Sequence, residues 1–185
     1  TDDGTFKGYA STRQKDSYGD VVEVGAFKRT IEANGGVVPI LDMHDPRKRV
    51  GLSTVLREEE HGLYTEGRLN LDTQIGRDAY SDLKFQVDGK HLIDRLSIGY
   101  TMLQHRYDKE EDTLYILELK LGEYSKVTRN FAANEGALIS GVKALDSYLA
   151  LTAGLERKDL DPAKIAEAIA SLKALLPAET PAPKA

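Results

Sequence analysis

Two segments of alternating apolar and polar residues constrain the fold of this chain more than any other feature. In residues 92–103 the even positions are mainly apolar, and in residues 113–123 the odd positions form an apolar face. A two-residue period is typical of strands that bury one face. The charged segment Asp108–Asp112 lies between the two and has the composition of a hairpin turn. The pattern therefore predicts a β-hairpin within a β-rich domain.

Shorter patterns predict the remaining elements. A continuous apolar run at residues 37–43 is typical of a strand buried on both faces, and the turn residues at 59–62 predict another hairpin. Strands are also expected at 5–11, 50–58 and 63–71, and helices at 24–33, 73–87, 137–151 and 162–176. Residues 1–140 are thus expected to form one β-rich domain. Residues 141–185 are expected to form a helical tail with a disordered Pro- and Ala-rich end.

Composition limits the classes of function. The 185 residues are 41% hydrophobic and 30% charged, which suits a globular protein. The absence of cysteine excludes disulfides, thiol nucleophiles and thiolate zinc sites. A net charge of −5 argues against nucleic-acid binding, and no apolar run approaches the roughly 20 residues that cross a bilayer. We therefore expect no metal, cofactor, nucleic-acid partner or membrane.

His44 stands out among the four histidines as a candidate general base. It follows the apolar run at 37–43, so packing would fix its position. The others lie in a predicted turn or at the polar ends of a strand, namely His61, His91 and His105. Hydrolysis by a serine hydroxyl needs a neutral imidazole as base and a third group that orients it. A purely structural histidine at position 44 stays open as the alternative.

Ser97 and Glu123 are the candidate nucleophile and third group. Ser97 lies in a strand between large apolar neighbours with Gly99 next on its face. A glycine inside a strand indicates close approach of another chain, such as a peptide substrate. Glu123 continues an apolar face, where a carboxylate is costly unless it is paired. The alternatives are a small residue under a helix at 97 and a solvated carboxylate at 123.

Six short motifs, taken in order, resemble those of the prohead maturation serine proteases of tailed bacteriophages. They are Gly8-Tyr9-Ala10-Ser11 with Asp16-Ser17-Tyr18-Gly19-Asp20, Gly25-Ala26-Phe27, Met43-His44-Asp45-Pro46, Asp72-Thr73 with Gly76-Arg77-Asp78-Ala79-Tyr80, Leu96-Ser97-Ile98-Gly99-Tyr100, and Gly122-Glu123-Tyr124-Ser125 with Val127-Thr128. The likeness covers about residues 5–140. Each motif alone is weak, but their order makes the resemblance specific.

The resemblance implies a fold and a set of site residues. The fold would be the α+β fold of herpesvirus assembly proteases, a mainly antiparallel β-barrel surrounded by helices. The triad would be His44, Ser97 and Glu123, with Glu118 as the alternative third member. By the same analogy Arg129 would help backbone amides to stabilise the oxyanion. The segment 128–134 departs from the family pattern, so a surface arginine is the alternative there.

The resemblance also implies partners and a place of action. The substrates would be the major capsid protein precursor and a scaffold segment, cleaved inside the assembling prohead in the host cytoplasm. Self-cleavage of the tail and a homodimer both stay open. A non-catalytic capsid-assembly or scaffolding module with the same fold is the alternative function. A metal-dependent hydrolase using His44 and Asp45 is disfavoured, because adjacent residues in an extended strand point to opposite faces.

Overall fold

The computed structural model describes residues 3–142 of the chain, which belong to one compact unit. Its elements are β1 (Thr5–Thr12), β2 (Asp20–Val22), α1 (Lys28–Asn34), β3 (Pro39–Asp42), β4 (Asp45–Glu58), β5 (Gly62–Leu69), α2 (Gln74–Lys84), β6 (Gln86–Val87), β7 (Lys90–His91), β8 (Arg95–Asp108), β9 (Thr113–Val127), the 3-10 helix η1 (Arg129–Phe131) and β10 (Ile139–Val142). The tail predicted from residue 141 lies outside the described residues beyond 142.

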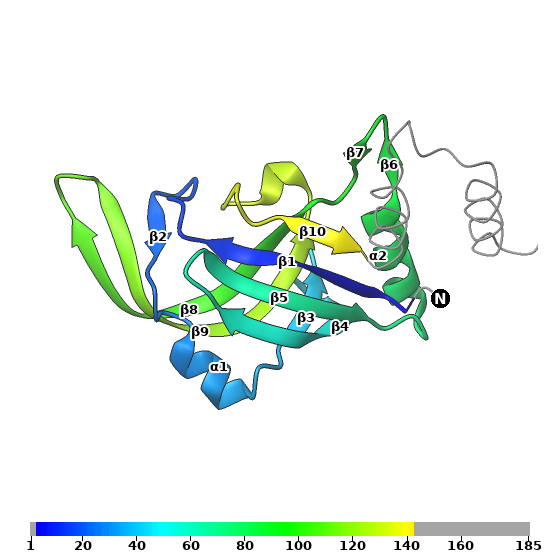
Figure 1. Cartoon of the computed structure of the whole chain (residues 1–185), viewed down its shortest axis with the longest axis horizontal. Helices are drawn as coiled ribbons and strands as arrows, with labels where there is room; N and C mark the ends of the chain where they lie inside the picture. Colours follow the sequence, from blue (N-terminus) through cyan, green and yellow to red (C-terminus); the bar gives the residue numbers. More distant parts are fainter. Residues whose placement is uncertain (1–2, 143–185) are drawn as a thin grey trace, which may run out of the picture. The chain divides into compact units, whose positions relative to one another are not determined.

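One sheet contains most of the strands. Its hydrogen-bonded order is β10-β1-β5-β4-β3-β9-β2, and β8 pairs with β9 (Figure 1). β8 meets the segment before β10 through a single bridge, Arg95 to Leu138, so the strand pairs do not describe a closed barrel. The predicted hairpins at 59–62 and 108–112 are both present. The prediction of a mainly β domain is confirmed, but the closed barrel surrounded by helices is not present: within residues 3–142 the α-helices are α1 and α2 alone.

Two strand pairs are parallel, which the sequence pattern did not predict. β2 and β3 both run parallel to β9, and Ile40 and Asp42 of β3 lie opposite Tyr124 and Lys126. Ile40 and its neighbour Leu41 are both buried, as expected for a strand covered on both faces. The parallel pair brings the end of β3 beside the second half of β9.

Helix α2 packs against β4 and β5 through its apolar face, which includes the buried Ala79 and Leu83. It begins where the Thr73 hydroxyl accepts a hydrogen bond from the Gly76 N–H, an ordinary N-cap. The helix ends at Lys84, earlier than the predicted 73–87. Val87 consequently belongs to β6 and is exposed.

Helix α1 packs against β9 and β4 and is also shorter than the predicted 24–33. Gly25 has a φ of 94°, which is outside the helical region, so the helix starts only at Lys28. Gly35 ends the helix in the left-handed conformation typical of a helix C-terminus.

The helix predicted at 137–151 is wrong over its described part. Residues Ile139–Val142 form β10, which pairs antiparallel with β1. At Gly8 of β1 a side chain would overlap the Leu138 carbonyl, so the absence of a Cβ allows the approach. Pairing with an available strand edge outweighs the local helix preference of this segment.

The predicted alternation in β9 holds only in part. Leu119 and Leu121 are buried, whereas Leu117 is 41% exposed and Ile116 is buried instead. The β8–β9 register shifts near Gln104, and a shift of one residue reverses the facing of the residues beyond it. A second shift lies next to Gly99.

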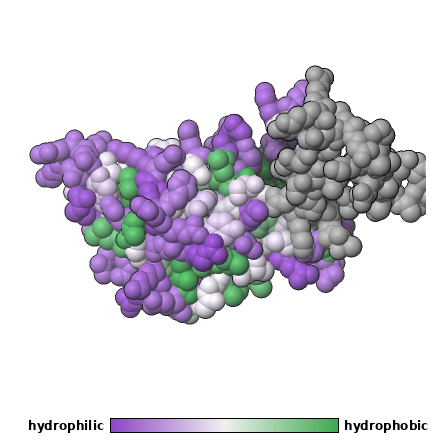
Figure 2. Space-filling model, viewed as in Figure 1, coloured by the Kyte–Doolittle hydropathy of each residue, from purple (hydrophilic) through white to green (hydrophobic). Residues whose placement is uncertain are grey.

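Within residues 3–142, no helix has both the length and the apolar composition to cross a bilayer. On the face shown in Figure 2, apolar areas are separated by polar residues.

Candidate active site

His44 lies at the tip of the β3–β4 hairpin. Asp42 pairs with Asp45, which leaves Met43 and His44 as a two-residue loop. Their φ angles are 53° and 60°. Positive φ at both loop residues is what a type I′ hairpin turn requires, and glycine or asparagine usually supplies it. Two bulky side chains therefore occupy a backbone conformation that costs each of them about 1–2 kcal/mol.

Two hydrogen bonds from the loop backbone to β9 hold this tip. The Met43 N–H donates to the Lys126 carbonyl at 3.1 Å, and the His44 N–H donates to Ser125 Oγ at 3.1 Å. The first extends the parallel β3–β9 pairing by one backbone hydrogen bond, and the second joins the tip to a side chain of β9. The position of the imidazole is consequently set by the sheet.

Ser97, Gly99, Glu123 and Ser125 share one face of the β8–β9 ladder. Ser97 lies opposite Ser125, and Gly99 lies opposite Glu123. A side chain at position 99 would overlap the Glu123 carboxylate. Gly99 thus makes room for Glu123, which differs from the predicted reason for this glycine, a neighbouring substrate backbone.

The His44 ring joins the other two predicted site residues. Its Nδ1 lies 2.7 Å from Glu123 Oε1, and its Nε2 lies 2.9 Å from Ser97 Oγ. An ionised carboxylate only accepts hydrogen bonds, so Nδ1 carries the proton and Nε2 of the neutral ring accepts from the Ser97 hydroxyl. The His44 side chain is 39% exposed and that of Glu123 only 13%. The arrangement can move a proton from a serine hydroxyl to an imidazole that solvent or a ligand can reach.

Ser125 is a site residue that sequence reasoning missed. Its Oγ–H donates to Glu123 Oε2 at 2.7 Å, and the same oxygen accepts from the His44 N–H. Its spacing was the available signal, because residues two apart on a strand share a face and Glu123 was already a candidate.

The two remaining predicted residues have other partners. Glu118 forms an ion pair with Arg29 at 3.0 Å and accepts from the Gln104 amide at 3.0 Å. Arg129 begins the helix η1, its side chain is 66% exposed, and its guanidinium contacts Asp94. The carboxylate that meets the His44 ring is that of Glu123.

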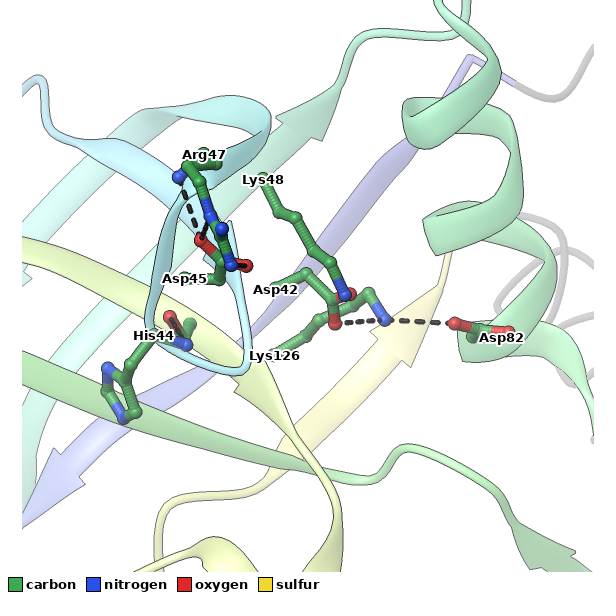
Figure 3. Close-up of polar contacts among 8 residues, drawn as sticks. Asp42, His44, Asp45, Arg47, Lys48, Asp82 and Lys126 are labelled. Atoms are coloured by element: carbon green, nitrogen blue, oxygen red, sulfur yellow. Dashed lines mark hydrogen bonds and ion pairs between the residues drawn. The ribbon is translucent and has the colours of Figure 1, made fainter.

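An ion cluster centred on a buried lysine lies behind the His44 tip. The Lys126 side chain is 3% exposed, and its Nζ lies 2.8 Å from Asp42 Oδ1 and 2.9 Å from Asp82 Oδ2 (Figure 3). Lys48 adds a longer contact to Asp42 at 3.5 Å. The cluster compensates a buried positive charge. It also ties β3, β9 and α2 together two residues before His44.

Asp45 follows His44 but belongs to a different contact. Hydrogen bonds from the Arg47 side chain and backbone lower the pKa of Asp45 to about 2. The His44 ring points away from this Asp45–Arg47 pair (Figure 3). Among residues 3–142, no three His, Asp or Glu side chains are grouped as ligands for a metal ion.

A family model and a relative from a bacteriophage both match the chain. The family model for the caudovirus prohead serine protease matches residues 1–149. A prohead protease of Escherichia phage T5 is 28% identical over 145 residues, which cover 77% of this chain and 65% of that protein. The chain thus spans slightly less than two thirds of that relative.

Two solved structures resemble the chain more distantly. KSHV protease in complex with a hexapeptide phosphonate inhibitor has 13% identity and a TM-score of 0.41 over 66% of this chain and 58% of that one. Varicella-zoster virus protease has 11% identity and a TM-score of 0.45 over 93% of this chain and 77% of that one.

Proposed function

The chain belongs to the caudovirus prohead serine protease family, and we propose that it is a serine endopeptidase that cleaves scaffold or major capsid protein precursors during prohead maturation. One observation carries the proposal, the continuous hydrogen-bonded series from Ser97 Oγ through the His44 ring to the Glu123 carboxylate. The three residues come from β8, the β3–β4 tip and β9. Such convergence of a hydroxyl, an imidazole and a carboxylate is the arrangement that activates a serine for acyl transfer.

In the proposed mechanism the Ser97 oxygen attacks a peptide carbonyl while His44 Nε2 accepts its proton. The imidazole becomes cationic at this step, and the Glu123 carboxylate at Nδ1 stabilises that charge and keeps the ring oriented. His44 then returns the proton to the leaving amine, which leaves an acyl group on Ser97. A water molecule, activated by the same ring, hydrolyses the acyl-enzyme.

The oxyanion needs donors of its own. We assign this role to backbone amides near Ser97 with help from Arg129, because electrostatic stabilisation of the developing charge is usually the largest catalytic effect. In the structure the Arg129 guanidinium contacts Asp94. A contribution from Arg129 thus requires it to leave or share that partner when substrate binds.

We place the reaction inside the assembling prohead in the host cytoplasm. Residues 1–140 would be the protease domain. The tail, 141–185, would direct the enzyme to the scaffold and would itself be open to self-cleavage. The family supports the place of action. The apolar stripe at Ile165, Ile169 and Leu172 and the Pro- and Ala-rich end support the roles of the tail.

The direct test is incubation of the purified chain with its capsid precursor, with the new termini read by mass spectrometry. The unaltered chain should release defined fragments, and Ser97→Ala should release none at a detectable rate, a loss of about 10⁴-fold or more. Ser140→Ala, at an exposed serine of β10, is the matched control and should cleave normally.

Cleavage by Ser97→Ala at the normal rate would end the proposal. An unaltered chain that cleaves nothing, yet is required for shells to assemble, would instead support the alternative of a non-catalytic assembly module.

A further inference from the structure

Ser125 occupies a position that the proposed reaction does not yet use. It is fully buried, on the same face of β9 as Glu123 and directly opposite Ser97. Its single hydroxyl makes two contacts of different kinds, one to a side chain and one to the backbone of the hairpin tip. Both end on residues of the proposed triad.

The first contact fixes the carboxylate. Glu123 Oε1 meets His44 Nδ1 at 2.7 Å, and Glu123 Oε2 accepts from Ser125 Oγ at 2.7 Å. With a donor on each oxygen, the carboxylate cannot rotate without losing a hydrogen bond. The absent side chain at Gly99 leaves the space in which the carboxylate lies. The plane of the carboxylate, and with it the direction from which His44 is held, therefore depends on Ser125.

The second contact fixes the backbone that carries the imidazole. The His44 N–H donates to Ser125 Oγ at 3.1 Å, while the His44 backbone has a φ of 60°. A residue in this region is retained only where its surroundings hold it there. A backbone N–H group that is left without a hydrogen-bond partner also destabilises the folded conformation in which it is unpaired. Ser125 thus supports the conformation of the tip as well as the carboxylate.

We propose that Ser125 is a positioning residue that aligns both His44 and Glu123 for the transfer of the Ser97 proton. This inference rests on the proposed protease function. Ser125 acts through the other two residues, and its hydroxyl does not reach the peptide bond. The proton that it donates to Glu123 stays on Ser125 throughout the reaction.

The test compares Ser125→Ala with a matched buried serine. Ser53 is also buried and accepts from a backbone N–H, that of Val38 at 2.8 Å, near the other end of β3. Both variants should lose similar stability against urea. Only Ser125→Ala should lose kcat, by about 10²-fold, because small misplacements of reacting groups have effects of that size. KM should change less than about twofold in both, since neither serine contacts the substrate.

A second variant tests whether unfolding, rather than the loss of the hydrogen bonds, causes the loss of kcat. Ser125→Cys keeps the same number of side-chain atoms, with sulfur slightly larger than oxygen, and replaces a strong donor by a weak one. It should fold like the unaltered chain and still lose most of the kcat that Ser125→Ala loses. Normal kcat in both Ser125 variants would overturn the proposal.

A spectroscopic measurement separates this proposal from the proposed function. In the folded chain with 15N-labelled histidine, the His44 Nδ1 proton should be protected from exchange by Glu123 and visible in the proton spectrum. Ser125→Ala should lose or broaden that signal, and Ser53→Ala should keep it. An unchanged signal in Ser125→Ala refutes the positioning role even if no substrate is ever cleaved, whereas absence of cleavage with the expected signals refutes the protease function alone.

Discussion

Two hairpin tips in this molecule have the same length and carry a histidine at the same place. At the β3–β4 tip, Asp42 and Asp45 enclose Met43 and His44. At the β4–β5 tip, mutual backbone hydrogen bonds between Glu59 and Gly62 enclose two residues, the second of which is His61. Both histidines are exposed. Neither loop length nor exposure distinguishes the proposed base from the other histidine.

The two tips differ in backbone conformation and in what meets the ring. Among the described non-glycine residues, positive φ occurs at Met43, His44, Asp88 and Asp112, so the β4–β5 loop is not left-handed. The His61 ring lies edge-on against Tyr9, with centroids 4.6 Å apart. The His44 ring instead meets a hydroxyl and a carboxylate from two neighbouring strands. A strained backbone held by polar partners, rather than exposure, marks the candidate site.

The largest expected effect separates the two histidines directly. His44→Ala removes the proposed base and should lower the rate of precursor cleavage by about 10⁴- to 10⁶-fold. His61→Ala removes an aromatic contact at an exposed tip and should leave the rate within about twofold. Initial rates of fragment release measure both. Equal rates in the two variants would mean that the ring contacts at position 44 have no catalytic consequence.

The next effect concerns the support beneath the β3–β4 tip. Lys126→Ala leaves the carboxylates of Asp42 and Asp82 facing each other without the ammonium between them, so we expect a loss of about 3 kcal/mol in the free energy of unfolding. Asp82 is 40% exposed, and water can partly replace its partner. Urea denaturation measures the change.

Lys120→Ala is the control for that prediction, because Lys120 is exposed on the same strand and should change stability by no more than about 0.5 kcal/mol. A Lys126 variant as stable as the Lys120 variant would show that the cluster does not hold the tip.

The smallest expected effect tests the backbone strain through the sign of a change in stability. Met43→Gly relieves a positive φ and should stabilise the protein by about 0.5 kcal/mol after the entropy cost of glycine is subtracted. Glu60→Gly, in a loop without positive φ, should destabilise by about the same amount. Melting temperatures from calorimetry should move in opposite directions. Shifts of the same sign in both would contradict the proposed difference between the tips.

The sequence predicted those elements that a local pattern defines, such as a two-residue period or the end of an apolar run. The apolar run before His44 and the paired hairpin strands around Asp108–Asp112 were visible as patterns, and the structure contains a strand at each place. The strand predicted at 37–43 is shorter, since β3 covers only Pro39–Asp42 and Val37 is exposed. Glu123 was noticed because a carboxylate interrupts an apolar face. Its burial next to a partner follows from the cost of leaving such a charge unpaired.

Other features depend on contacts with residues that are distant in the sequence, and a local pattern does not predict those contacts. The segment from Ala137 has helix-forming residues, yet Ile139–Val142 pair with β1 as a strand. The register shifts in the β8–β9 ladder decide which residues of β9 are buried, and a period of two cannot locate them. Lys126, charged and almost fully buried, is tolerated only because Asp42 and Asp82 arrive from other elements.

By itself, the amino-acid sequence determined a β-rich domain, a histidine at the end of a buried strand, and a serine and a carboxylate on later strands. Only the tertiary structure decided that these groups meet, because the parallel pairing of β3 with β9 joins segments about 80 residues apart. That pairing places the His44 ring between Ser97 and Glu123 and puts the Ser125 hydroxyl behind it. Hydrogen bonds between distant strands depend on register and packing, which a linear pattern of polarity does not encode.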